Sequence, residues 1–159
     1  MSMKSGWLSQ LSACALAVPL LLAWGVAAAE WAGEPQTPLK IELEGLADVT
    51  GMVYIALYNR EEDWLGENVF AAAELEIESS REGELVSTEL LLPPGQYAMM
   101  VFYDSNGNGE LDTSFMGSPK EPIAMSNNAK SKFGPPDYED AVFDVVLEPV
   151  IQRVNIRPF

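Results

Sequence analysis

The feature that most constrains the fold is a two-residue alternation of apolar and polar side chains that recurs in short segments. Residues 39–45 read LKIELEG, so leucine and isoleucine face one way while lysine and glutamate face the other. This is the period of a β-strand with one covered and one exposed face. Residues 50–59 and 96–104 are apolar on both faces, which is typical of central strands. The segments predicted as strands are 39–45, 50–59, 73–79, 85–92, 96–104, 141–147 and 151–157.

About seven strands with turn residues between most of them predict an all-β fold, an antiparallel β-sandwich. No segment has the period of a long helix. The acidic stretch 60–70 breaks the alternation and is predicted as a loop or one or two helical turns. Residues 111–140 are rich in Gly, Pro, Asn and Ser and show almost no periodicity. A run of this length without regular structure is usually functional or disordered.

The N-terminus has the pattern of an export signal. A short lead with one lysine precedes an uncharged apolar run at 13–29, with small residues at Ala27 and Ala29. This pattern predicts a signal peptide cleaved before Glu30, and hence a periplasmic or extracellular location in a bacterium. The run is at the lower limit for a membrane helix and has no basic flank after it, so we expect no membrane span after cleavage. The predicted organisation is 1–29 signal peptide, 30–38 flexible lead and 39–159 β-sandwich domain.

The small number of cysteine and histidine residues excludes several kinds of catalytic and metal site. The sequence LSAC at 11–14 resembles a lipoprotein cleavage box, which makes lipid attachment at Cys14 an alternative, but the apolar run lies mainly after this cysteine. A chain that begins at Glu30 has no cysteine and no histidine. Disulfides within the chain, zinc sites built on Cys or His, and catalysis by Cys or His are then excluded.

The charge of the chain argues against nucleic acid as a partner. The 159 residues carry 24 acidic and nine basic side chains, a net charge of −15. Loss of Lys4 with the signal peptide changes this to about −16. Such an acidic surface repels polyphosphate and attracts cations, although solubility alone also accounts for it.

Residues 104–112, DSNGNGELD, carry oxygen-bearing side chains at alternate positions around two glycines. Gly109 permits the sharp bend that turns alternate residues toward a common centre. Calcium takes six to eight oxygen ligands from carboxylates, amides, carbonyls and water. The segment therefore predicts a calcium-binding loop. The expected ligands are Asp104, Asn106, Asn108, the backbone carbonyl of Glu110, and Asp112.

The same loop departs from an EF-hand. Its twelfth position is Phe115, where an EF-hand has a bidentate glutamate. The missing ligands would come from water or from elsewhere in the chain, with Asp137, Glu139 and Asp140 as candidates. A plain hairpin is the alternative, because Asn-Gly occurs twice and favours a type I′ turn. With two carboxylate ligands, we expect a modest dissociation constant, on the order of 10⁻⁴ to 10⁻³ M.

The stretch LPPGQYAMMVFYDSNGNGELD, followed by MGSPKEP, SNNAK and FGPPDYEDAVF, resembles the bacterial exported domain of unknown function family 2141. The resemblance spans most of the chain after residue 29. It implies an exported β-sandwich of the immunoglobulin or transthyretin kind and no particular activity. Where such family members tend to have EGYGFS, this chain has EPIAMS at 121–126. LPPGQY also resembles a tyrosine corner, in which the Tyr97 hydroxyl bonds back to the backbone.

Residues 126–140 offer an alternative binding region for an extracytoplasmic protein or glycan. Asparagine amides and aromatic faces are suited to sugars and peptides, and loops on a rigid sandwich often bind ligands. The competing interpretation is a compact loop that packs on itself. The residues in the binding interpretation are Asn127, Asn128, Phe133 and Tyr138, together with Trp64. Those in the packing interpretation are Phe133, Pro135 and Tyr138.

The leading functional hypothesis is an exported non-catalytic β-sandwich module, of unknown biological role, that binds calcium at 104–112. Binding of carbohydrate or peptide through 126–140 is the alternative. A hydrolase that depends on carboxylates such as Asp137, Glu139 and Asp140 is the least favoured, because it requires two carboxyl groups set across a cleft.

Overall fold

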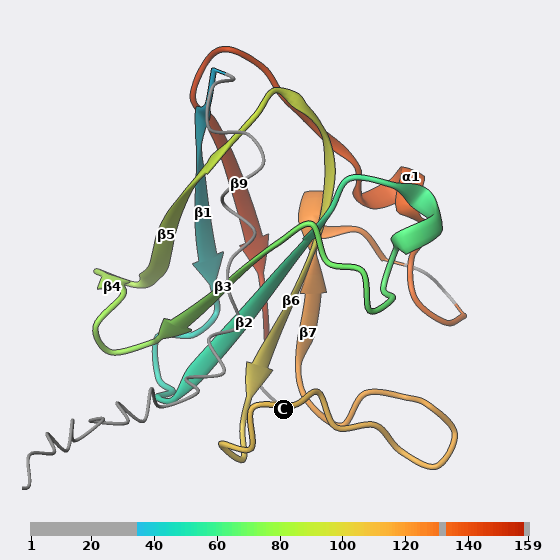
Figure 1. Ribbon diagram of the computed structural model, residues 1–159. Helices are drawn as coiled ribbons and strands as arrows, with labels where there is room; N and C mark the ends of the chain where they lie inside the picture. Colours follow the sequence, from blue (N-terminus) through green and yellow to red (C-terminus); the bar gives the residue numbers. More distant parts are fainter. Residues whose placement is uncertain (1–34, 131–132, 158–159) are drawn as a thin grey trace, which may run out of the picture.

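The computed structural model describes residues 35–130 and 133–157, which form a two-layer, mostly β structure (Figure 1). Two short 3₁₀ turns, η1 (Glu61–Asp63) and η2 (Ser126–Asn128), and one helical turn, α1 (Tyr138–Ala141), lie between strands. The strands are β1 (Thr37–Glu44), β2 (Met52–Tyr58), β3 (Ala71–Glu76), β4 (Arg81–Glu82), β5 (Leu85–Leu92), β6 (Gly95–Asp104), β7 (Ile123–Met125), β8 (Phe143–Val145) and β9 (Val150–Asn155).

The strands form two sheets that pack face to face. One sheet has the order β4-β5-β1-β9, and the other has the order β3-β2-β6-β7 with β8 also paired to β6. All pairs are antiparallel except β1 and β9, which run parallel. The predicted all-β sandwich is confirmed.

The core lies between the sheets and follows the alternation in the sequence. Leu39, Ile41 and Leu43 of β1 are fully buried. Val53, Ile55 and Leu57 of β2 belong to the same cluster of buried residues. Each such side chain contributes about 1.5–3 kcal/mol of hydrophobic free energy relative to an exposed position. The one-sided burial of these strands holds the two sheets together.

The outer face of β6 is covered as well, which explains why this strand is apolar on both faces. Ala98 and Met125 are buried there in a second, smaller cluster, against which Trp64, Met100 and Tyr138 pack. Trp64 and Tyr138 come from the η1 and α1 segments, which close over the sheet at the same end of the molecule (Figure 1). β2 and β6 are interior strands of their sheet, as predicted.

The tyrosine corner is present. The Tyr97 hydroxyl donates to the Pro93 carbonyl at 2.8 Å, and the ring is buried. The bond ties the start of β6 to the turn that precedes it, which confirms the structural role predicted for this tyrosine.

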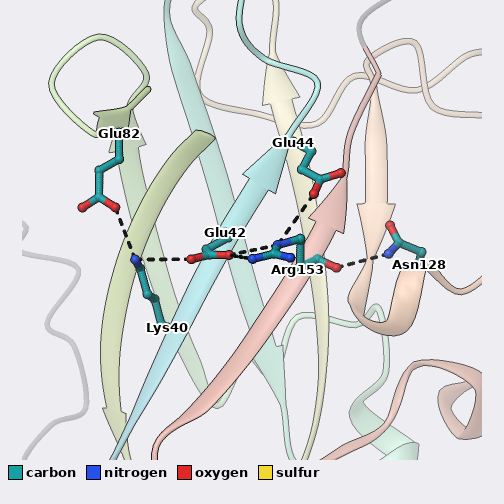
Figure 2. Close-up of polar contacts among 6 residues, drawn as sticks. All are labelled: Lys40, Glu42, Glu44, Glu82, Asn128 and Arg153. Carbon is teal, nitrogen blue, oxygen red and sulfur yellow. Dashed lines mark hydrogen bonds and ion pairs between the residues drawn. The ribbon is translucent and has the colours of Figure 1, made fainter. Parts of the chain in front are cut away.

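Ion pairs stabilise the outer face of the four-stranded sheet (Figure 2). Arg153 of β9 donates from Nε and Nη2 to Oε2 of Glu42, at 2.9 and 2.6 Å. Lys40 approaches the other oxygen of Glu42 at 3.3 Å. The hydrogen bond from Arg153 is the largest influence on Glu42 and, with Lys40, lowers the pKa of that carboxyl despite its partial desolvation. The network joins β9 to β1 across the parallel pair.

Several boundaries differ from the prediction. β1 begins at Thr37, inside the segment 30–38 that was expected to be a flexible lead, because Thr37 already pairs with Leu92 of β5. The predicted strand 141–147 is shortened to β8, because α1 occupies its first residue. The stretch 111–140 contains β7, η2 and most of α1.

The predicted signal peptide and Cys14 lie outside the described residues. Within 35–130 and 133–157, no helix has the length and apolar character needed to cross a membrane.

Candidate metal-binding loop

Strand β6 ends at Asp104, whose carboxylate organises the loop that follows. The residue is only 3% exposed. Its Oδ1 accepts from the backbone N–H of Asn106 at 3.2 Å and of Gly107 at 2.6 Å, and its Oδ2 accepts from the N–H of Gly109 at 2.8 Å. Gly107 and Gly109 have φ of 75° and 78°, a left-handed conformation that glycine adopts without strain. The two glycines therefore let the backbone curl around one buried carboxylate.

The two loop asparagines extend this arrangement toward Asp112. The Oδ1 of Asn106 accepts from the N–H of Asn108 at 3.0 Å, and the Oδ1 of Asn108 accepts from the N–H of Glu110 at 2.8 Å. Their Nδ2 groups donate to Asp112 Oδ2 at 2.6 and 3.2 Å. The four predicted side-chain ligands thus belong to one hydrogen-bonded loop, while Glu110 contributes its backbone.

Glu121 completes the loop, although the sequence pattern does not predict it as part of the site. It is 2% exposed, and its Oε1 accepts from the N–H of Ser105 at 2.9 Å while its Oε2 accepts from the N–H of Asp112 at 3.2 Å. One carboxylate therefore joins the first and last turns of the loop. Its position follows from strand pairing, because the Tyr103 N–H donates to the Pro122 carbonyl at 3.0 Å and so sets Glu121 beside the end of β6.

The three acids proposed as additional ligands, Asp137, Glu139 and Asp140, lie far from the loop. They are exposed and lie at α1 or immediately before it. The α1 turn packs near Ala98, whereas the loop leaves β6 at Asp104, so the two regions lie at opposite ends of that strand (Figure 1). The prediction that these acids supply ligands to the loop is therefore wrong.

The donor set of the loop is mixed. In the part of the chain that the structure describes, no three His, Cys, Asp or Glu side chains are grouped so as to hold a metal by themselves. Any ion at the loop would depend on the amides and backbone carbonyls as well as on the carboxylates. Oxygen donors of these kinds are the ligands that calcium accepts.

The side chains of Asn127 and Asn128 are used within the fold. The Nδ2 of Asn127 donates to the Val142 carbonyl at 2.8 Å. Asn128 donates from Nδ2 to the Arg153 carbonyl at 3.1 Å (Figure 2). Its Oδ1 accepts from the Asn155 N–H at 2.7 Å. The Asn128 amide thus takes the place of a neighbouring strand along the free edge of β9.

Two aromatic residues of the alternative binding region, Trp64 and Tyr138, pack against each other. Trp64 donates from Nε1 to the Pro136 carbonyl at 3.0 Å, and its ring meets those of Tyr58 and Tyr138 edge-on, with centroids 5.3 and 5.9 Å apart. Phe133 is 92% exposed and Pro135 is exposed, so neither side chain is buried in the loop. Pro136 is buried in their place.

The electrostatics of Asp104 depend on two opposing effects. Burial, the larger single influence, raises the pKa of this carboxyl. The N–H groups of Gly109, Gly107, Asn106 and Asn108 lower it, and together they prevail, so the pKa of Asp104 lies below its ordinary value. Among the described residues, no lysine or arginine lies within 4.0 Å of Asp104 or Glu121. The ionised form of Asp104 is therefore stabilised by backbone N–H groups and not by a basic side chain.

This pKa shift predicts an acid-sensitive contribution to stability. A carboxyl whose pKa is lower in the folded state stabilises that state above its unfolded pKa of about 3.9, and the contribution is lost as the pH falls through the folded value. We expect the difference in free energy of unfolding between the wild type and Asp104→Asn to be largest above about pH 5 and to shrink toward pH 2. Urea unfolding of both proteins at several pH values measures it. A difference that stays constant over this range would contradict the shift.

Comparison with known proteins places the chain in a family. A family model described as an uncharacterized protein conserved in bacteria, DUF2141, matches residues 41–152. The match runs from β1 to β9 and includes the loop, Glu121 and η2. No curated protein and no solved structure is detectably similar to the chain. With more than half of its length matched, the chain belongs to the bacterial family of uncharacterized proteins DUF2141.

Proposed function

We propose that the loop of residues 104–112, completed by Glu121, binds calcium, and that the protein is an exported, non-catalytic β-sandwich module stabilised by this ion. The observation that carries the proposal is Glu121. It is a buried carboxylate that contacts both ends of a loop whose own twelfth position, Phe115, has no oxygen in its side chain. Glu121 supplies from a distant turn the carboxylate that an EF-hand carries at that position.

The charge of the site supports a cation. Asp104 and Glu121 are buried beside the same loop in a protein of net charge −15, and no described basic side chain pairs with either. Backbone N–H groups outweigh the desolvation of Asp104, and a bound cation would add the counter-charge that both carboxylates lack. Calcium suits this set better than magnesium, because it accepts many oxygen ligands in flexible geometry, whereas magnesium requires a near-ideal octahedron.

The hydrogen bonds already made in the loop set the expected affinity. A calcium ion competes with the Asn106 and Asn108 amides for Asp112 Oδ2. Breaking these contacts reduces the net gain on binding. We therefore expect a dissociation constant on the order of 10⁻⁴ to 10⁻³ M, as in extracellular modules.

Calorimetry with calcium, and thermal melting in calcium or in chelator, test the proposal. A ligand that binds only the folded state with this affinity stabilises it by about 1.4–2.7 kcal/mol at roughly 10 mM. We expect the melting midpoint to rise accordingly, and to rise less with magnesium at the same concentration. Identical curves in calcium and in chelator would remove the proposal.

Two variants separate the site from general charge effects. Asp104→Asn removes a buried loop carboxylate and should abolish the calcium-dependent shift. Glu110→Gln removes an exposed carboxylate from the same loop while keeping its backbone carbonyl, so binding should persist. Equal loss in both variants would indicate unspecific attraction of cations to an acidic surface.

A further inference from the structure

A groove runs between the edge strands β7 and β9, on the side of the sandwich where both sheets end. It consists of two adjoining hollows of about 570 and 250 Å³ that share Ile123, Asn128, Lys130 and Asn155. We call it the β7 groove. Its walls combine apolar surface from Ile123 with two basic side chains, Lys130 and Arg157. Glu121 also lines the groove, but its carboxylate is buried, and its two oxygens accept from the backbone N–H groups of Ser105 and Asp112.

The two basic residues are available to an anion. Among the described residues, neither Lys130 nor Arg157 lies within 4.0 Å of a carboxylate, although the chain has 24 acidic residues. The Nε of Arg157 donates to Asn155 Oδ1 at 2.9 Å, which orients the guanidinium group. Its terminal nitrogens make no hydrogen bond with the described chain. A guanidinium held in this way is suited to a carboxylate, which it binds through two parallel hydrogen bonds.

Strand β7 offers main-chain groups to the same groove. It pairs only with β6, so its second edge has no strand beside it in the described structure. Because Tyr103 bonds to Pro122, the alternation of an antiparallel pair makes Val101 and Ala124 the next bonded pair. The N–H and C=O groups of Ile123 and Met125 then point toward the free edge. By contrast, the facing edge of β9 is already capped by Asn128.

We propose that the β7 groove binds an extended peptide segment of another protein, which adds a strand to β7 and places one carboxylate side chain against Lys130 and Arg157. The free strand edge selects an extended peptide, because only a main chain satisfies a row of backbone groups. The two basic residues select a carboxylate. The net charge of −15 repels polyacidic ligands, so the ligand carries a single acidic side chain near the contact.

Titration of the ¹⁵N-labelled protein by NMR tests this with two capped pentapeptides, TVEVT and its uncharged counterpart TVQVT. We expect TVEVT to shift the amide signals of Ile123 and Met125 and to bind about tenfold more tightly than TVQVT, a difference of about 1.4 kcal/mol. Arg157→Gln and Lys130→Gln should each reduce the affinity for TVEVT toward that for TVQVT. Arg60→Gln is the matched control, because Arg60 is an exposed arginine outside the groove, and it should leave the affinity unchanged.

The other outcomes overturn the proposal. Equal binding of both peptides would remove the carboxylate contact. Binding of free glutarate as tight as that of TVEVT would show a site for small carboxylates in place of a strand. The absence of any shift at Ile123 and Met125 up to about 10 mM TVEVT, a binding free energy weaker than about −3 kcal/mol, would remove the groove as a peptide site. Glu121 of the proposed calcium site also lines the groove, so the titration is run both in chelator and in calcium. Binding of TVEVT in chelator supports the groove whether or not calcium binds the 104–112 loop.

Discussion

Replacing Ser126 by alanine is expected to lower the free energy of unfolding by about 2–4 kcal/mol. Ser126 has no exposed surface. Its hydroxyl accepts from the N–H of Met99 at 2.9 Å and donates to the carbonyl of Ala141, so one side chain joins β6 to the end of α1. Alanine leaves a buried donor and a buried acceptor without partners, and each unsatisfied group costs about 1–3 kcal/mol.

Urea unfolding of Ser126→Ala against the wild type measures this effect. Ser79→Ala is a suitable control, because Ser79 is exposed and its hydroxyl bonds to the Glu76 carbonyl, only three residues earlier in the same turn. We expect the control to change stability by less than about 0.5 kcal/mol. If both variants lost a similar amount of free energy of unfolding, the hydrogen bonds of Ser126 to β6 and α1 would not contribute specially to stability.

The features that the sequence predicts correctly depend on residues that are close together in the chain. Alternation is a property of neighbouring residues, so β5 was predicted with its observed bounds and β6 to within one residue. Buried inner faces require that alternation, and turn residues end it. The same reasoning identified Tyr97 and the side chains of the 104–112 loop, because their partners lie a few residues away.

The missed features depend on pairing between distant segments. Glu121 reaches Ser105 only because β7 pairs with β6. Strand β7 has three residues and follows a proline, and a segment this short shows too little alternation to be predicted as a strand. Asn128 was read as a surface amide, but its partners on β9 are 25 or more residues away. Asn127 and Asn128 also have φ of 58° and 52°, a left-handed pair that sequence periodicity does not reveal.

Replacing Glu121 by alanine is expected to have the largest effect of the substitutions considered, and the size of that effect should depend on calcium. In chelator, the N–H groups of Ser105 and Asp112 lose their shared acceptor, which costs about 1–3 kcal/mol each when water cannot replace it. The variant also removes one of two buried negative charges near the loop, and the relief of their repulsion partly offsets this cost. We therefore expect the free energy of unfolding in chelator to fall by about 2 kcal/mol, the lower end of that range.

In calcium, the same substitution removes a ligand as well as a support for the loop. The wild type gains about 1.4–2.7 kcal/mol from roughly 10 mM calcium, and the variant should gain almost nothing, so the total loss rises to about 3–5 kcal/mol. Urea unfolding of both proteins in calcium and in chelator measures the two losses separately. Glu139→Ala, at an exposed carboxylate on α1, should have little effect in either condition. If Glu121→Ala loses the same free energy with and without calcium, Glu121 only supports the loop, because a ligand must be worth more when its ion is present.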